Sequence, residues 1–354
     1  MAGHHRPARP IRIPGPFGAD LPSKGLVEKT GRGAEKDHEG GPAEVKDVSR
    51  LKRVLDQGGF AVTAECGPPK GADAEAILKK AELLRSTVDA VNVTDNQTAI
   101  VRMSSLAACS LLKSAGLDPV LQVVVRDRNR IALQSDILGA SALGIRNILC
   151  LSGDHQSFGN QPQAVGVFDL DSIQFVQVAR TMRDKGTILG GEALTKAPEL
   201  FIGAAANPFG DPFAFRVVRL AKKVAAGAEF IQTQCIYNLD RFEKWMAMSR
   251  DRGLTEKTCI LGGVTPLKSA GMARYMKKKV AGMDVPDEVI RRMESVPAKK
   301  QAEEGLKICV ETIQRLKEIP GVRGVHIMAI EWEDKVAEIA EKAGLLPRPV
   351  ISKQ

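Results

Sequence analysis

Residues 61–69 have the sequence AVTAECGPP, and this stretch decides which α/β fold the chain adopts. The run AVTAE (61–65) is short and rich in small or β-branched residues, as a buried parallel strand requires. A doubly wound nucleotide-binding sheet usually has a GxGxxG turn after its first strand, but Pro68 and Pro69 remove two N–H donors at that place. The stretch therefore favours a (β/α)8 barrel over a doubly wound sheet.

Seven similar apolar runs follow along the chain, with longer amphipathic segments between them. Gly116, Gly144, Gly227 and Gly321 end several of these segments, where a glycine allows a left-handed helix end at no steric cost. Eight strands alternating with helices predict a (β/α)8 TIM barrel, an α/β fold, over residues 46–345. The expected strands are 61–65, 90–94, 119–125, 147–151, 201–206, 230–234, 259–264 and 324–330, and the expected helices include 72–86, 129–143, 172–185, 213–226, 240–252 and 302–318.

The two ends of the chain depart from this pattern. Residues 1–45 carry Pro, Gly, His and scattered charges without apolar periodicity, so we expect an extended N-terminal arm that is either flexible or ordered against a partner. A dispensable tail is the alternative for the same segment. Residues 346–354 follow the last part of the expected barrel as a C-terminal tail.

Composition narrows the function classes. With 44% hydrophobic and 26% charged residues, the 354-residue chain can form a sizeable core. It has no apolar run long enough to span a membrane, and its first residues lack the apolar segment of a secretory signal, so we expect a cytoplasmic protein without a membrane span. The net charge of +9 suits anionic ligands or an acidic partner, while 4% aromatic residues argue against the stacking of nucleic-acid bases.

The six cysteines form no CxxC pair, and no histidine cluster lies near them. This spacing is not that of a zinc ribbon or an iron–sulfur site. We expect reduced, mostly buried thiols and no metal bound by this chain.

Polar residues at the ends of barrel strands are the first candidates for chemistry, because barrel active sites lie at the carboxyl ends of the strands. Glu65 ends the first strand between Ala64 and Cys66. Burial there disfavours the charged carboxylate, so Glu65 can donate a proton, although pairing with a nearby Lys or Arg is the alternative. Asp154 follows the fourth strand in CLSGD, as either a second functional carboxylate or a turn former, and Gly153 lets the backbone approach a ligand.

Short polar side chains and amides end other strands. Amides can hydrogen-bond the edge of a flat heterocycle, although each one alone can also serve only to satisfy loop backbone groups. These residues are Thr94, Asp95, Asn96, Gln122, Asn207, Gln232 and Gln234.

A basic helix follows the fifth strand. Its spacing places Arg216, Arg219 and Lys223 on one face, which can bind a phosphate or diphosphate if that face lies near the barrel mouth. A solvated amphipathic face is the alternative. The lysine run at 277–279 is interpreted as surface, with partner docking as the lesser option.

Five motifs in this order resemble the methylenetetrahydrofolate reductase family, whose members are flavin-dependent (β/α)8 barrels. They are TAECGPP, VNVTDN, LSGD, KKVAAGAEFIQTQ and GVTPL, and the resemblance covers roughly residues 50–345. It implies that Glu65 is the general acid that protonates N10 of the folate, that Asp154 lies beside the flavin and the pterin, and that Gln234 hydrogen-bonds folate. The positions that match flavin contacts are Thr94, Gln122, Ser152, Gly153, Asp154 and Asn207, with Lys223 near the phosphates and Arg216 and Arg219 adding charge there.

Several residues depart from the family pattern. The stretch TPLKSAG lacks the aromatic residue against which the nicotinamide cofactor stacks in many relatives, so direct use of NAD(P)H is left open. Gln122 and Ser152 replace a His and an Arg, and the extra cations suit a terminal monophosphate. The resemblance implies FAD as the flavin, with FMN as the alternative.

These departures resemble reductases of anaerobic one-carbon metabolism, in which the barrel subunit receives electrons from an iron–sulfur or flavin partner protein. We therefore expect an oligomer or a hetero-complex that reduces 5,10-methylenetetrahydrofolate to 5-methyltetrahydrofolate. Two rivals remain: a pterin-binding methyltransferase barrel without flavin, and a non-catalytic scaffold or electron-relay subunit.

Overall fold

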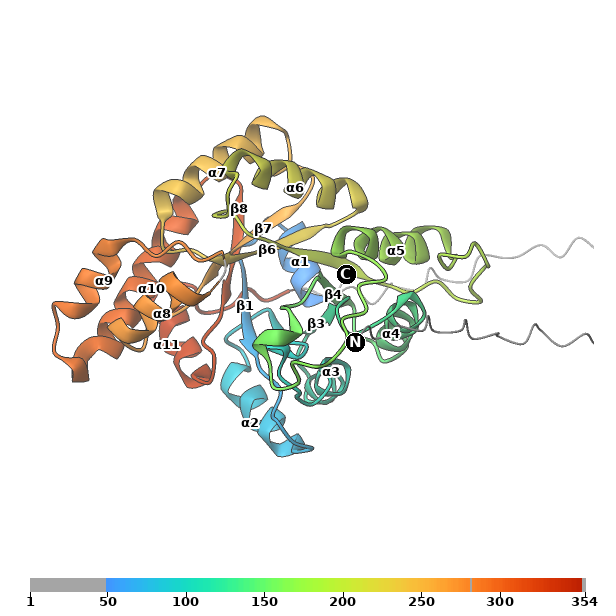
Figure 1. The fold of residues 1–354 in the computed structure, drawn as a ribbon, viewed down its shortest axis with the longest axis horizontal. Helices are drawn as coiled ribbons and strands as arrows, with labels where there is room; N and C mark the ends of the chain where they lie inside the picture. The colour runs from blue at the N-terminus through green and yellow to red at the C-terminus, as the bar shows by residue number, and fades with distance from the viewer. Residues whose placement is uncertain (1–48, 281, 352–354) are drawn as a thin grey trace, which may run out of the picture. The chain divides into compact units, whose positions relative to one another are not determined.

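The computed structural model describes residues 49–280 and 282–351, so the expected N-terminal arm at 1–45 lies outside the described residues. Eight parallel strands pair in chain order, and β1 pairs with β8 to close the barrel (Figure 1). The (β/α)8 prediction is confirmed. The strands are β1 (Ala61–Cys66), β2 (Ala90–Val93), β3 (Pro119–Val124), β4 (Asn147–Leu151), β5 (Phe201–Ala206), β6 (Phe230–Cys235), β7 (Cys259–Val264) and β8 (Val322–Ile327).

Helices surround the strands (Figure 1). The four glycines expected at helix ends all have positive φ, between 73° and 120°. The α-helices are α1 (Arg50–Asp56), α2 (Ala74–Leu84), α3 (Ser105–Ser114), α4 (Arg130–Ala142), α5 (Ser172–Lys185), α6 (Phe213–Ala226), α7 (Leu239–Asp251), α8 (Ala270–Lys279), α9 (Asp287–Glu294), α10 (Gln301–Glu318) and α11 (Val336–Lys342). Short 3-10 turns are η1 (Gln97–Ala99), η2 (Gln156–Phe158), η3 (Ala298–Lys300) and η4 (Glu333–Lys335). None of the described helices is long and apolar enough to cross a membrane.

The last strand differs from the expected range 324–330. β8 begins earlier, at Val322, which pairs with Ile260 of β7, and it ends at Ile327. The chain turns soon afterwards, because Glu331 has a left-handed backbone with φ +50°. The apolar run MAI (328–330) therefore belongs to the loop after β8, and Met328 from this run lines the cavity described below.

The N-terminal end of the barrel is filled with apolar side chains. Leu51 and Val54 of α1 pack against residues at the starts of the strands, including Phe201 and Phe230. The two phenylalanine rings stack with centroids 4.9 Å apart. They fit because β5 has Gly203 at the neighbouring position, where an added Cβ would lie 2.2 Å from the Phe230 ring. This packing leaves the opposite end, at the carboxyl ends of the strands, for a ligand.

The described part of the C-terminal tail contacts this closed end. Arg348 donates hydrogen bonds to the Phe60 carbonyl and to Asp89, which is buried. Asp89 also accepts hydrogen bonds from Arg50 and from the Val62 amide. Ile351 packs against the same apolar cluster as α1.

Candidate active site

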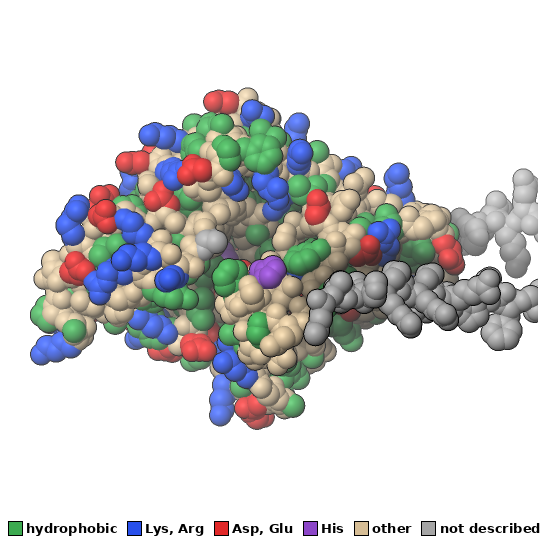
Figure 2. Space-filling model, in the orientation of Figure 1, with side chains coloured by type: hydrophobic (Ala, Val, Ile, Leu, Met, Phe, Trp, Pro, Cys, Tyr) green, Lys and Arg blue, Asp and Glu red, His purple; other side chains and the backbone are tan. Residues whose placement is uncertain are grey.

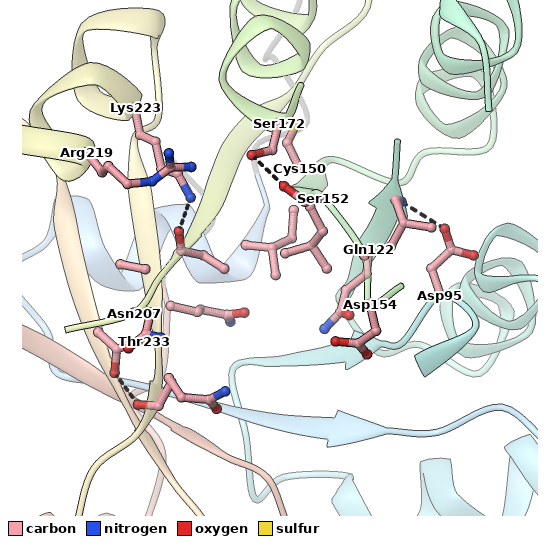
Figure 3. A pocket seen from close by; sticks show the side chains of 18 of the residues that line it. Asp95, Gln122, Cys150, Ser152, Asp154, Ser172, Asn207, Arg219, Lys223 and Thr233 are labelled. Atoms are coloured by element: carbon pink, nitrogen blue, oxygen red, sulfur yellow. Dashed lines mark hydrogen bonds between the residues drawn. The ribbon is translucent and has the colours of Figure 1, made fainter. Parts of the chain in front are cut away.

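A cavity of about 760 Å³ opens at the carboxyl ends of the strands (Figure 3). Its wall combines residues from strand ends, from the loops that follow them and from α6. All but one of the predicted site residues line it. They are Glu65, Gln122, Ser152, Gly153, Asp154, Asn207, Arg216, Arg219, Lys223 and Gln234.

Thr94 is the exception. It is 1% exposed at the end of β2, and its hydroxyl has no hydrogen-bond partner in the described part of the protein. It is not among the residues that line the cavity, so its expected flavin contact stays a prediction.

Glu65 lies at the end of β1 and is 6% exposed. Its Oε1 accepts a hydrogen bond from Gln97 Nε2 at 3.2 Å, and its Oε2 lies 3.8 Å from His326 Nε2. Within the described residues no Lys or Arg forms an ion pair with it. The alternative of a Lys or Arg partner therefore does not describe this carboxyl group, which instead contacts an amide and an imidazole.

A buried polar network lies beside Glu65 inside the barrel. Thr63 Oγ1 is 2.9 Å from His326 Nδ1 and accepts a hydrogen bond from Gln232 Nε2 at 3.3 Å. Gln232 in turn pairs with Asn92 through two hydrogen bonds of 2.5 and 3.0 Å. These groups come from β1, β2, β6 and β8, and their buried side chains satisfy one another's hydrogen-bonding atoms.

The Thr63 hydroxyl lies between two groups of β8. Its Oγ1 is 3.4 Å from the Val325 carbonyl oxygen and 2.9 Å from Nδ1 of His326. The other ring nitrogen, Nε2, faces Glu65 Oε2 at 3.8 Å, which is longer than a hydrogen bond. Glu65 and His326 thus place a carboxyl group and an imidazole side by side at the edge of the cavity.

Asp154 is exposed in the loop after β4. Its Oδ2 accepts a hydrogen bond from the Thr98 amide at 2.9 Å, so it binds a neighbouring loop instead of forming its own turn. Gly153 before it has φ +84°, and a Cβ there would lie 3.0 Å from Val124 and 3.2 Å from Arg126. A side chain at this position would therefore collide with protein side chains, while the Gly153 backbone lines the cavity, so its expected approach to a ligand stays a prediction.

Arg126, which the sequence analysis did not find, holds this part of the mouth together. It is 3% exposed and lines the cavity after β3. Its guanidinium donates to the carbonyls of Asp154, at 2.8 Å, and Asn96, at 3.3 Å. Hydrogen bonds to Asp127 raise the pKa of Arg126, so it stays charged. Asp95 is likewise structural, because it pairs with Arg128 and accepts from the Val124 amide.

The three basic residues of α6 line one side of the cavity, as their spacing predicted. Burial, and then the neighbouring Arg219, lowers the pKa of Lys223 to about 8, and its ammonium donates to the Ala205 carbonyl. Arg216 donates to the carbonyls of Gly210 and Asp211. Among the described residues, none of the three forms an ion pair, and Figure 3 shows Arg219 beside Lys223. This uncompensated charge fits a phosphate group.

The side-chain amides of Gln122, Gln232 and Gln234 differ in how many of their hydrogen-bonding atoms are unpaired and available to a ligand. Gln232 is fully used by Asn92 and Thr63, so it belongs to the buried network. Gln122 is 7% exposed, and its side chain forms no hydrogen bond with any described residue. Gln234 accepts from its neighbour's amide through Oε1, which leaves its Nε2 free of partners in the described structure. Gln122 and Gln234 are thus the amides available to a heterocyclic ligand.

Ser152 and Asn207 contribute smaller polar groups. Ser152 Oγ donates to Ser172 Oγ at 3.1 Å, and Asn207 Oδ1 accepts from the Phe209 amide. The wall between the polar groups is small or apolar, with Ala205, Ala206 and Leu151 among its members. A flat ring system with polar edges and a phosphate tail fits this donor set and this basic side. No group of three described His, Cys, Asp or Glu residues is placed to hold a metal ion.

Known proteins provide an independent comparison. Residues 50–344 match the family described as methylenetetrahydrofolate reductase. A probable methylenetetrahydrofolate reductase (NADPH) of Caenorhabditis elegans is 25% identical over 252 residues, which cover 69% of this chain and 35% of that protein. Methylenetetrahydrofolate reductase 1 of Schizosaccharomyces pombe is 28% identical over 215 residues, which cover 58% and 32%. The matched part is about a third of the length of each relative.

One solved structure has a similar fold. It is an uncharacterized protein from Clostridium thermocellum that binds two copies of 5-methyl-5,6,7,8-tetrahydrofolic acid, with a TM-score of 0.55 at 14% identity, covering 83% of this chain and 98% of that one. At this identity the likeness concerns the fold alone. The family match extends from α1 to α11 and so includes every strand of the barrel, and the chain belongs to the methylenetetrahydrofolate reductase family.

Proposed function

We propose that this chain reduces 5,10-methylenetetrahydrofolate to 5-methyltetrahydrofolate with a flavin bound in the barrel mouth. The observation that carries the proposal is Glu65, a buried carboxyl group 3.8 Å from the His326 imidazole, at the edge of a cavity that the described structure lines with free amides and unpaired cations. Family membership supports the choice of substrate. A flavin supplies the hydride that the substrate accepts.

The residues of the mouth divide between the two ligands. Arg216, Arg219 and Lys223 would hold the phosphate of the flavin, because they are cations without carboxylate partners in the described structure. Gln122, Ser152 and Asn207 line the same cavity and would bind the ring edges. Gln234 is assigned to the pterin, since its Nε2 is free to donate.

Glu65 performs the proton step. Its proton passes to N10 of the folate, the bond between N10 and the methylene carbon breaks, and the positive charge moves to the N5 iminium. Hydride addition at the methylene carbon then completes the methyl group. His326 Nε2 lies 3.8 Å from Glu65 Oε2, so the imidazole is the neighbour of the carboxylate that remains. The Asp154 carboxylate favours the cation electrostatically.

The proposal also covers the identity of the electron donor and of the flavin. We infer an electron-delivering iron–sulfur or flavin partner protein, in a cytoplasmic oligomer or hetero-complex, with NAD(P)H as the alternative donor. FAD follows from the family, while the cation cluster on α6 suits the terminal phosphate of FMN. Chromatography of the released cofactor separates the two flavins.

One alternative function also has an observation in its favour. The solved neighbour from Clostridium thermocellum binds 5-methyltetrahydrofolic acid, so a pterin-binding barrel that transfers a methyl group without flavin is the rival. A purified protein that is colourless and cannot be reconstituted with FMN or FAD would favour this rival and refute the reductase.

Replacing the acid tests the mechanism directly. Glu65→Gln keeps the size of the side chain and removes the transferable proton, so it should retain flavin but lose at least about 100-fold in the oxidation of the photoreduced flavin by methylenetetrahydrofolate. Glu288→Gln on α9 is the matched control, because Glu288 is exposed and outside the cavity wall. Near-normal folate turnover by Glu65→Gln would show that Glu65 is not the acid.

A further inference from the structure

A single short segment joins the two carboxylates of the mouth. Gln97 and Thr98 are neighbours in the loop between β2 and α3. The Gln97 side-chain amide donates to Glu65 Oε1 at 3.2 Å, and the Thr98 backbone amide donates to Asp154 Oδ2 at 2.9 Å. The proposed mechanism uses both carboxylates, but it does not yet explain this segment.

The backbone of the segment is strained. Asn96, Thr98 and Ala99 have φ values of +45°, +57° and +55°, in the left-handed region that residues other than glycine rarely adopt. Such strain persists only where the surroundings impose it, and it gathers at functional sites. The structure thus keeps Gln97 in place against a local conformational preference.

Neighbouring groups hold the segment in this conformation. Asn96 Oδ1 accepts from the Arg102 amide at 3.0 Å, and the Asn96 carbonyl accepts from Arg126. The loop after β4 also packs closely against it, because a Cβ at Gly159 would lie 1.8 Å from the Ala99 carbonyl oxygen. These contacts leave the Gln97 side chain directed at Glu65.

We propose that Gln97 is a positioning residue for proton donation by Glu65. Its amide fixes the orientation of the carboxyl group and stabilises the carboxylate that remains after the proton has moved to the substrate nitrogen. A hydrogen bond to an ionised acceptor is stronger than one to a neutral acceptor, so the donor favours the state that proton transfer produces. This inference rests on the proposed function, because it requires Glu65 to act as the acid.

The other groups near Glu65 are the same in every variant described below. His326 from β8 faces Oε2, and Asp154 lies in the same cavity. The Cys235 thiol of β6 stays neutral, because burial raises its pKa to about 12. Lys80 of α2 is bound to Glu333 and to the Gly67 carbonyl. A difference between wild type and a Gln97 variant therefore reports on Gln97.

The pH profile of the folate step provides the test. In Gln97→Met the side chain keeps its length and loses the amide. Without this donor the carboxyl group releases its proton less readily, so the rate on the acid side of the profile should fall about threefold to tenfold. For the same reason the descending limb, where Glu65 loses its proton, should move about half a unit to one unit toward higher pH.

The assay is the oxidation of photoreduced flavin by methylenetetrahydrofolate, followed anaerobically from about pH 5 to about pH 9. Gln163→Met is the matched control, since Gln163 is an exposed residue of the loop after β4 that does not line the cavity. Gln97→Asn keeps the polarity of the segment, but its amide is one methylene too short to reach Glu65. The descending limb of its pH profile should therefore move to higher pH as in Gln97→Met.

Each outcome decides the inference. A lower rate with an unmoved descending limb in both Gln97 variants would mean that the residue only supports the loop, and the inference would be wrong. An unchanged rate and profile would also overturn it. If wild type lacks folate-dependent flavin oxidation, or Glu65→Gln keeps it, the proposed function fails and the Gln97 inference fails with it. If the wild type is active, Glu65→Gln is inactive and Gln97→Met has the rate and pH profile of the wild type, only the Gln97 inference is refuted.

Discussion

The lowered pKa of Lys223 predicts that phosphate binding in the mouth depends on pH. Burial lowers this pKa from 10.5 to about 8, and the nearby Arg219 adds to the effect. In the free protein, Lys223 is then about 90% charged at pH 7 and about 10% charged at pH 9. A bound phosphate dianion favours the charged lysine and raises its pKa in the complex.

The expected magnitude follows from this difference. If the lysine remains charged in the complex up to pH 9, the affinity for a phosphate-bearing flavin should fall about tenfold between pH 7 and pH 9. An arginine side chain does not lose its proton in this pH range, so the slope is assigned to the lysine. The affinity for riboflavin, which lacks the phosphate, should change little.

The measurement is a titration of apo-protein with FMN and with riboflavin, followed by flavin fluorescence at several pH values. Lys223→Met should bind FMN more weakly at pH 7 and lose most of the pH dependence. Lys222→Met is the matched control, because Lys222 is exposed and lies outside the cavity wall. Equal pH slopes for FMN and riboflavin, or an unchanged slope in Lys223→Met, would refute the assignment of Lys223 to the phosphate.

Two further predictions concern the barrel itself. Gly203→Ala should lower the free energy of unfolding by about 1–3 kcal/mol, because the added Cβ would lie 2.2 Å from the Phe230 ring. Chemical denaturation measures the free energy of unfolding, with Gly271→Ala as the control, since an added Cβ there meets nothing closer than 3.5 Å. Equal stabilities of the two variants would contradict the packing argument. Iodoacetamide should alkylate the native protein slowly and at Cys259 first, since the other five thiols are buried and burial raises the pKa of Cys66 to about 12. Peptide mass spectrometry measures the labelling, and Cys66 labelled as fast as Cys259 would contradict the packing of Cys66 in the core.

The strands could be predicted because each is a local apolar run with few alternatives. The expected ranges 147–151, 201–206 and 259–264 agree with β4, β5 and β7. The eighth strand was placed too late because its first residues include Arg323, which interrupts the apolar run, and because the run MAI (328–330) continues past the strand end. Sequence patterns locate apolar stretches, whereas the turn at Glu331 decides where pairing stops.

The site was predictable only in part. Glu65, Asp154 and Gln234 could be found because each follows a recognisable strand, and the barrel rule places strand ends at the mouth. His326 was missed, although its alternation with Gly324 and Met328 placed it on the inner face of β8. No sequence pattern indicated Gln97, because its position depends on neighbours with a left-handed backbone, and without a glycine the sequence does not predict that conformation.

Asp89 has a mechanical consequence for the barrel. It binds Arg50 in the first described helix, Arg348 near the last described residue and the Val62 amide of β1. A force that pulls residues 49 and 351 apart therefore loads Asp89, together with the hydrogen bond from Arg50 to the Pro349 carbonyl and the packing of Ile351, before it reaches the seam between β1 and β8. The loops that line the cavity, at the opposite end of the strands, lie outside that load path, so tethering the protein through residues 49 and 351 should leave the cavity undistorted.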